Sequence, residues 1–116
     1  MNEVPLFSSL NIRSITFRNR IVLSPMCQYK AKDGMISDWH LQHYSRFAFS
    51  GLGAAFVEAT GVTPEGRIGH GCTGIWSDDH IAGLSKIAKT FKDYNCVSGI
   101  QLAHAGRKAS FLRPWD

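Results

Sequence analysis

The sequence has few cysteines, and their positions exclude two kinds of site. Three cysteines in 116 residues are too few for a dense disulfide framework, and no two of them have the close spacing of a zinc-binding pair. We therefore expect no metal site and a reducing setting, which places the chain in the cytoplasm. The three cysteines are Cys27, Cys72 and Cys96.

Long apolar runs and dense runs of charge are also missing. No stretch approaches the ~20 apolar residues of a membrane-spanning helix. Residues 1–6 lack the basic region and apolar core of a secretory signal. The net charge is +4, from 13 Lys and Arg against 9 Asp and Glu, but the basic residues are scattered singly. We therefore expect neither membrane association nor nucleic-acid binding, which uses a clustered basic face.

What the sequence does contain is the composition of a folded domain. Apolar residues make up 44% and charged residues 19%, a balance typical of globular proteins. A chain of 116 residues is long enough for one domain with a modest core. We therefore treat residues 1–116 as part of a single domain.

Hydrophobic patterns predict strands that alternate with helices. Loose alternation predicts a hairpin, and short unbroken apolar runs predict strands that are covered on both faces. Apolar residues spaced three or four apart predict amphipathic helices. The expected order is hairpin, strand, helix, strand, helix, strand, over residues 10–17, 21–23, 39–50, 54–59, 77–95 and 97–102.

Local signals predict where the helices begin and which faces they bury. Either Asp38 or Ser37 is expected to cap the first helix, and Asn95 is expected to end the second. Residues 60–76 contain five glycines and predict a long irregular loop without the spacing of a phosphate-binding motif. The predicted buried positions are Leu41, Tyr44, Phe47 and Ala48 in the first helix and Ile81, Leu84, Ile87, Ala88 and Phe91 in the second.

The alternation of strands and helices predicts an α/β fold with parallel strands and right-handed crossovers. Three strands and two helices do not close a barrel, and a complete (β/α)₈ barrel needs roughly 250 residues. We therefore expect the first three β/α units of a TIM barrel, preceded by a β-hairpin, in a chain that is cut short.

Ligands of parallel α/β folds bind at the carboxyl ends of the strands. In this sequence those ends are residues 24–29, 58–60 and 101–104. Each combines polar groups with small or apolar side chains, the composition of a largely apolar pocket with a few directed hydrogen bonds.

Five motifs, taken together and in their order along the chain, make a more specific identification possible. They read LNIRSITFRNRIVLSPMCQY, DWHLQHYSRFA, VEATGVTPEGR, GIWSDDHI and GIQLAHAGRKAS. From about Leu6 onward the chain resembles the N-terminal third of the Old Yellow Enzyme family, flavin-dependent ene-reductases built on a (β/α)₈ barrel. The cysteine in the SPMC turn is typical of the bacterial-type subgroup.

The resemblance implies roles for individual residues. Cys27 would lie near the flavin C4 carbonyl and N5 and adjust the reduction potential, and Tyr29 would reach the substrate; both count as catalytic candidates. No direct contact is assigned to His104 or Arg107. The implied FMN contacts are Ser24, Pro25, Met26, Cys27, Ala59 and Gln101.

Without the resemblance, the same residues have simpler interpretations. Cys27 would be a small core residue, Tyr29 a half-buried aromatic residue, and Gln101 a partner for a neighbouring backbone group. His40, His43 and His80 would belong to helix starts or faces. Cys72 and Cys96 have no partner that the sequence identifies.

The resemblance implies that NAD(P)H reduces the flavin, which then reduces an α,β-unsaturated carbonyl compound. The protein would position and tune the ring. In relatives, the donors that hold the substrate carbonyl and the groups that bind the flavin phosphate come later, so we expect this chain alone to be inactive. The longer protein would be a candidate homo-oligomer.

Two alternatives stay open at this stage. The first is a related flavin barrel that acts on dienoyl thioesters or amines. The second is a short non-catalytic product that associates with a partner chain through its unclosed sheet.

Overall fold

The computed structural model describes residues 4–116 and contains the hairpin, strands and helices in the predicted order. Short 3₁₀ turns cover Pro5–Phe7, Asp78–His80 and Gly106–Lys108. The main elements are β1 (Leu10–Ile12), β2 (Ile15–Phe17), β3 (Val22–Leu23), α1 (Asp38–Phe49), β4 (Ala54–Gly61), α2 (Ile81–Asp93) and β5 (Val97–Ala103).

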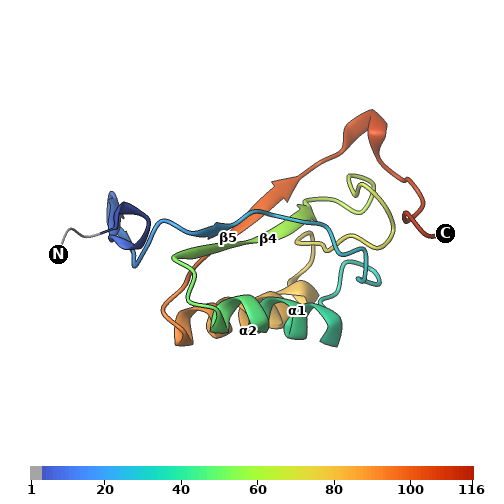
Figure 1. Ribbon diagram of the computed structural model, residues 1–116. Coiled ribbons are helices and arrows are strands. Elements are labelled where there is room, and N and C mark those ends of the chain that lie inside the picture. Colours follow the sequence, from blue (N-terminus) through green and yellow to red (C-terminus); the bar gives the residue numbers. More distant parts are fainter. Residues whose placement is uncertain (1–3) are drawn as a thin grey trace.

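The strands after the hairpin form a parallel sheet in the order β3-β4-β5. Val22 pairs with Ala54, and Ala54 pairs with Val97. Both helices lie on one side of this sheet, and the β1–β2 hairpin lies beyond its amino-terminal end (Figure 1). A register shift in β4 between Val57 and Thr60 interrupts the alternation of side chains just before the carboxyl end of the strand.

The core lies between the helices and the sheet. The rings of Tyr44 and Phe91, one from each helix, meet edge to face with centroids 6.0 Å apart. Burial of a large side chain such as Phe91 contributes roughly 1.5–3 kcal/mol, so this contact between the two helices is a major part of the stability. The buried core cluster consists of Tyr44, Ala48, Ala55, Val57, Ile87, Phe91 and Cys96.

The predicted buried face of α1 is largely confirmed, since Tyr44 and Ala48 are buried and Leu41 and Phe47 pack against the core. The structure adds His40, which is fully buried. Ser37 is the N-cap of this helix, and Asp38 is its first residue.

The predicted buried face of α2 is wrong at two positions. Ile87 and Phe91 are buried and Leu84 packs against the core, but Ile81 is 57% exposed and Ala88 is also exposed. The reason is that α2 has a neighbouring helix on one side only within residues 4–116. The terminator Asn95 is confirmed, with a φ of 56° just after the helix. No helix in this part of the chain is both long and apolar enough to cross a bilayer.

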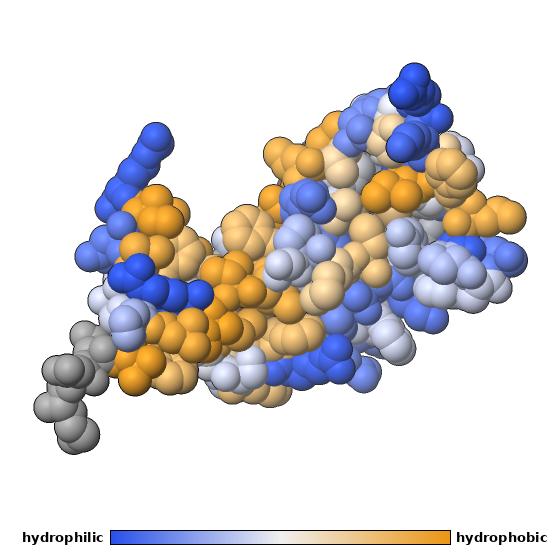
Figure 2. Space-filling view, turned by 45° about the horizontal axis from the view of Figure 1, so that its top comes forward, coloured by the Kyte–Doolittle hydropathy of each residue, from blue (hydrophilic) through white to orange (hydrophobic). Residues whose placement is uncertain are grey.

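The face of the sheet opposite the helices is uncovered within the described residues, although short apolar runs are typical of strands covered on both faces. Val22 and Phe56 project from this face and are 47% and 39% exposed. The ring of Phe56 lies over Gly99, where an added Cβ would meet it at 2.5 Å. Figure 2 shows apolar atoms running along the middle of the molecule, beside the hairpin.

The predicted loop is irregular over residues 62–76, since β4 extends to Gly61, and it is not loosely held. It turns back on the end of β4, where Gly61 N–H donates to the Thr73 carbonyl at 2.9 Å and Ile75 N–H donates to the Gly61 carbonyl at 2.9 Å. The buried hydroxyls of Thr60 and Thr73 are 2.9 Å apart and share a hydrogen bond. The loop therefore forms a fixed wall beside the carboxyl ends of the strands.

Candidate functional site

A shallow hollow of about 460 Å³ lies over β3, β4 and β5 and extends to the segment that follows β3. Three of the residues predicted to contact a cofactor, Ser24, Pro25 and Gln101, lie together in its lining. The remaining lining residues are the apolar Val22, Phe56 and Ile100.

Cys27 and Ala59, two more of the predicted residues, also lie together. Cys72 and burial raise the pKa of the Cys27 thiol, whereas the nearby Ala59 backbone acts to lower it, and Ala59 itself is buried. Met26, between Pro25 and Cys27, is 48% exposed. The turn therefore presents the methionine outward and holds the cysteine against β4.

Tyr29 adopts a left-handed backbone conformation, with a φ of 55°. Its ring meets that of Trp115 edge to face, with centroids 6.2 Å apart. Partial burial raises the pKa of Tyr29, and the nearby Cys27 acts in the same direction. The hydroxyl is therefore held in its neutral, proton-carrying form.

Cys72 is a member of this site that the sequence did not reveal. Its thiol lies near that of Cys27 and, together with burial, raises the pKa of the Cys27 thiol, although the two residues are far apart in the chain. Cys72 is only 1% exposed. No local pattern around either residue marks the pair, because their proximity depends on how the loop over residues 60–76 returns to the sheet.

A buried carboxylate anchors the turn after β3. Glu58 is fully buried and accepts the Gln28 backbone N–H at 3.1 Å and the Tyr44 hydroxyl at 2.8 Å. The Glu58 backbone N–H donates to the same Tyr44 oxygen at 2.9 Å. Burial and the neighbouring Glu58 raise the pKa of Tyr44, so the tyrosine is a neutral donor. Glu58 thus ties β4, α1 and the turn together.

His40 completes this buried cluster. Its Nδ1 accepts the Ser37 backbone N–H at 3.0 Å, so the proton of the neutral ring is on Nε2. Nε2 is buried, has no hydrogen-bond partner among residues 4–116, and lies 3.7 Å from Glu58 Oε1. The Nε2 proton therefore faces the carboxylate across a gap that is longer than a hydrogen bond.

The sequence contained a signal for this cluster. Glu58 interrupts the apolar run AAFVEA, and a glutamate in a buried strand requires partners. His40 and Tyr44 are four residues apart and therefore lie on one face of a helix. The missing step was to connect that face of α1 to the one charged residue of β4.

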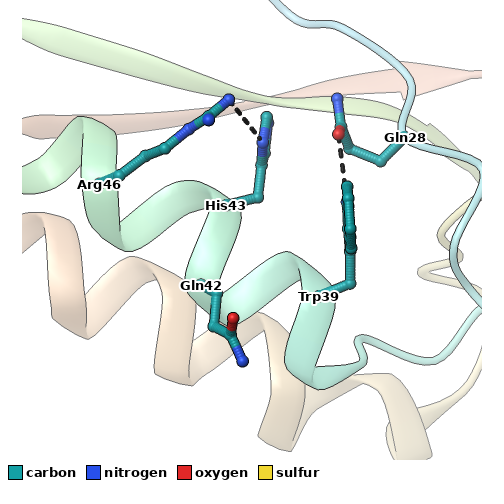
Figure 3. A pocket seen from close by; sticks show the side chains of 5 residues that line it. All are labelled: Gln28, Trp39, Gln42, His43 and Arg46. Atoms are coloured by element: carbon teal, nitrogen blue, oxygen red, sulfur yellow. Dashed lines mark hydrogen bonds between the residues drawn. The ribbon is translucent and has the colours of Figure 1, made fainter.

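A second, separate pocket of about 300 Å³ lies between α1 and the turn after β3 (Figure 3). Trp39 Nε1 donates to Gln28 Oε1 at 3.2 Å, which connects the helix to the turn after β3. The Arg46 Nη2 and His43 Nδ1 atoms lie 3.4 Å apart. Partial burial lowers the pKa of His43, and the Arg46 guanidinium acts in the same direction.

Parallel β/α units with polar groups at the carboxyl ends of the strands are typical of the α/β class, which includes the (β/α)₈ barrels. The sequence profile of the NADH:flavin oxidoreductase / NADH oxidase family matches residues 5–113. The chain belongs to this family, whose members use FMN and NAD(P)H. The resemblance found in the sequence is confirmed.

Individual relatives are much longer than this chain. An NADPH dehydrogenase of Geobacillus thermodenitrificans is 51% identical over 111 residues, covering 94% of this chain and 32% of the relative. An NADPH dehydrogenase of Bacillus subtilis is 47% identical over 106 residues, covering 90% of this chain and 31% of the relative. The chain thus spans about a third of the length of the curated relatives it matches.

The same holds for solved structures. The Old Yellow Enzyme homologue from Zymomonas mobilis superposes with a TM-score of 0.82 at 26% identity, covering 91% of this chain and 30% of that structure. The predicted fold class, the first β/α units of a TIM barrel after an N-terminal hairpin, is therefore confirmed.

Proposed function

We propose that this chain forms the part of an FMN-dependent ene-reductase that holds one edge of the flavin. The substrate class would be α,β-unsaturated carbonyl compounds, with NAD(P)H as the reductant. The observation that carries the proposal is that Ser24 and Pro25, which follow β3, and Gln101, in the second half of β5, share the lining of one hollow.

The residues at this hollow fit a flat, mostly apolar ring with a polar edge. Val22 and Phe56 provide the apolar wall, and its volume of about 460 Å³ lies in the range of small-molecule sites, roughly 300–1,000 Å³. The Gln101 side chain carries both a donor and an acceptor, as the pyrimidine edge of a flavin requires. FMN, when bound, supplies the redox chemistry of the reaction.

The chain's own contribution would be to orient the flavin ring and to adjust its reduction potential. Gln101 would fix the ring edge, and Cys27 would offer its thiol proton to the ring. Tyr29, held neutral, would hydrogen-bond the substrate or deliver a proton to it. Glu58 would act indirectly, by holding the Gln28 backbone and with it the turn that carries Cys27.

We infer that residues 1–116 alone do not turn over substrate. The apolar face around Val22 and Phe56 is uncovered in this part of the chain, and such faces promote association. Nothing in the site favours dienoyl thioesters or amines as substrates.

The test is a titration of the purified chain with FMN, followed by absorbance and size exclusion. A shifted flavin band that co-elutes with the protein supports the proposal, and NADPH consumption with an enone is then measured. Flavin that elutes separately from a folded chain would contradict the proposed site. Binding should weaken about tenfold in Gln101→Ala, since one to two hydrogen bonds are lost.

The matched control is Gln42→Ala. Gln42 lies on α1 and is not part of the lining of the proposed flavin hollow, so its loss should leave FMN binding unchanged. Equal effects of the two substitutions would show that FMN binding does not depend on the proposed edge contact.

A further inference from the structure

The loop after β4 fixes the backbone at Tyr29. This residue has a φ of 55°, in the left-handed region that is uncommon for residues other than glycine. The backbone N–H of Ala31 donates to the Gly71 carbonyl at 2.9 Å. A Cβ at Gly71 would lie only 2.5 Å from the Tyr29 carbonyl oxygen, so the two backbones approach as closely as glycine allows. These contacts determine where the Tyr29 side chain begins, but they do not determine where its ring points.

The ring of Tyr29 contacts Trp115, which comes from the C-terminal segment, residues 110–116. The two ring centroids are 6.2 Å apart and the ring planes meet at 77°, the edge-to-face geometry that aromatic pairs prefer. The C-terminal segment is itself attached to the loop after β4, since the Phe111 backbone N–H donates to the Ile68 carbonyl at 2.8 Å. This attachment brings Trp115 back to the turn after β3.

Lys30 contacts the same indole from the residue next to Tyr29. Its Nζ lies 4.6 Å from the ring centroid of Trp115 and 5.1 Å from that of Trp39. Both distances are within the ~6 Å reach of a cation–π interaction. Among residues 4–116, no carboxylate forms a salt bridge with Lys30. The ammonium group therefore connects two indoles, one at the start of α1 and one in the C-terminal segment.

Arg113 is a second cation near Trp115, but its charge is already paired. The guanidinium carbon lies 5.7 Å from the ring centroid, farther than the Lys30 ammonium. Its Nη2 and Nε donate to the Asp116 carboxylate at 2.8 Å and 2.9 Å. A carboxylate at this distance offsets most of the attraction between the guanidinium charge and the ring. Lys30 is therefore the cation that draws Trp115 toward the turn after β3.

We propose that Trp115 is a positioning residue that directs the ring of Tyr29, and that Lys30 holds Trp115 in place. Trp115 is 53% exposed, so its place depends on these contacts rather than on burial in the core. If Tyr29 binds the substrate, Trp115 determines the direction in which the tyrosine hydroxyl meets it. That consequence rests on the proposed function, whereas the contact itself requires neither FMN nor substrate.

The test is NMR spectroscopy of the whole chain with ¹³C-labelled tyrosine rings, without FMN. The chain has three tyrosines, and a Tyr29→Phe variant identifies the signals of Tyr29. An indole that faces a neighbouring ring displaces the signals of that ring from their positions in the unfolded chain. In Trp115→Leu, the Tyr29 signals should move most of the way to their positions in urea, while those of Tyr44 and Tyr94 stay in place.

Variants of Lys30 test the second half of the proposal. Lys30→Met removes the cation but leaves both indoles, and it should displace the Tyr29 signals in the same direction as Trp115→Leu. Lys30→Arg should restore them, because a guanidinium also binds the face of an aromatic ring. The matched control is Lys32→Met, which removes the same charge from an exposed side chain at the next lysine and should leave the Tyr29 signals unchanged.

Circular dichroism on each variant reports whether the helices are intact. Tyr29 signals that stay in place in a folded Trp115→Leu chain would overturn the positioning role of Trp115. Equal effects of Lys30→Met and Lys32→Met, or no recovery in Lys30→Arg, would overturn the role of Lys30. A chain that does not bind FMN would contradict the proposed flavin site without changing these signals, so the two proposals fail separately.

Discussion

The two helices of this chain begin with nearly the same four residues, yet the two starts have different surroundings. Ser37-Asp38-Trp39-His40 opens α1, and Ser77-Asp78-Asp79-His80 precedes α2. In both, the histidine Nδ1 accepts the backbone N–H of the serine, at 3.0 Å and 3.3 Å. Both rings therefore direct the Nε2 proton away from the helix end.

The difference lies in what Nε2 meets. In the second unit, His80 Nε2 lies 3.0 Å from the Asp33 carbonyl oxygen, a neutral and well-placed acceptor. In the first unit, His40 Nε2 faces the Glu58 carboxylate at 3.7 Å. The local sequence thus determines the cap. The segment that faces the ring determines whether Nε2 meets a backbone carbonyl, as in His80, or a carboxylate, as in His40.

The strongest way to break this comparison is to remove the carboxylate. Glu58→Ala leaves Gln28 N–H and the Tyr44 hydroxyl without acceptors, and the loss should reach about 3–5 kcal/mol of unfolding free energy. Urea denaturation followed by circular dichroism measures it. The exposed Glu65→Ala is the matched control and should change stability by less than about 0.5 kcal/mol. Equal losses would mean that the buried cluster contributes nothing specific.

The next largest effect is expected at alkaline pH, where Tyr44 of the first helix should make stability depend on pH. Burial raises the pKa of Tyr44 above its ordinary value of 10.0, so above pH 10 the unfolded tyrosine loses its proton while the folded one keeps it. The contribution of Tyr44 to stability should therefore be constant below pH 10 and fall above it by up to about 1.4 kcal/mol per pH unit. In Tyr44→Phe this alkaline slope should shrink, although stability at neutral pH is lower. An unchanged slope in that variant would contradict the prediction.

A double-mutant cycle sharpens the comparison. His40→Ala and Glu58→Gln, alone and together, should show a coupling energy of about 1 kcal/mol, within the range for residues in contact. The same cycle with His80→Ala should give a coupling near zero, since His80 bonds Asp33 instead. Additivity in both cycles would show that the 3.7 Å approach carries no energy.

The smallest expected effect concerns the caps themselves. Ser77 Oγ accepts the Asp79 backbone N–H at 3.3 Å, so Ser77→Ala should cost about 1 kcal/mol. Ser37 Oγ instead donates to the Lys30 carbonyl or contacts His40 Nδ1, so Ser37→Ala should cost less. A larger loss at Ser37 than at Ser77, measured by thermal unfolding, would reverse this order.

Local patterns in the sequence were enough to predict the element order and the hairpin. The apolar runs and the helical spacing of Tyr44 and Ala48 reflect period and burial, which neighbouring residues largely determine. Ile81 and Ala88 were predicted wrongly because exposure on α2 depends on which elements cover it. That information is not local.

The residues of the candidate site were also predictable from the sequence only in part. The positions of Ser24, Pro25 and Gln101 follow from the rule that parallel strands end at one edge, and the structure brings them together. The proximity of Cys27 and Cys72 and the role of Glu58 depend on tertiary packing across distant segments. Whether the predicted residues contact FMN or substrate stays a prediction.

The hairpin described above has a practical consequence for handling the molecule. Its turn has Arg13 in a left-handed conformation, with a φ of 53°, next to an exposed Ser14, and it lies at the opposite end from the strand carboxyl ends (Figure 1). Exposed turn tips tolerate insertions. A fluorophore or affinity handle grafted between Arg13 and Ser14 would therefore report on the chain, or immobilise it, without obstructing the hollow where the flavin is proposed to bind.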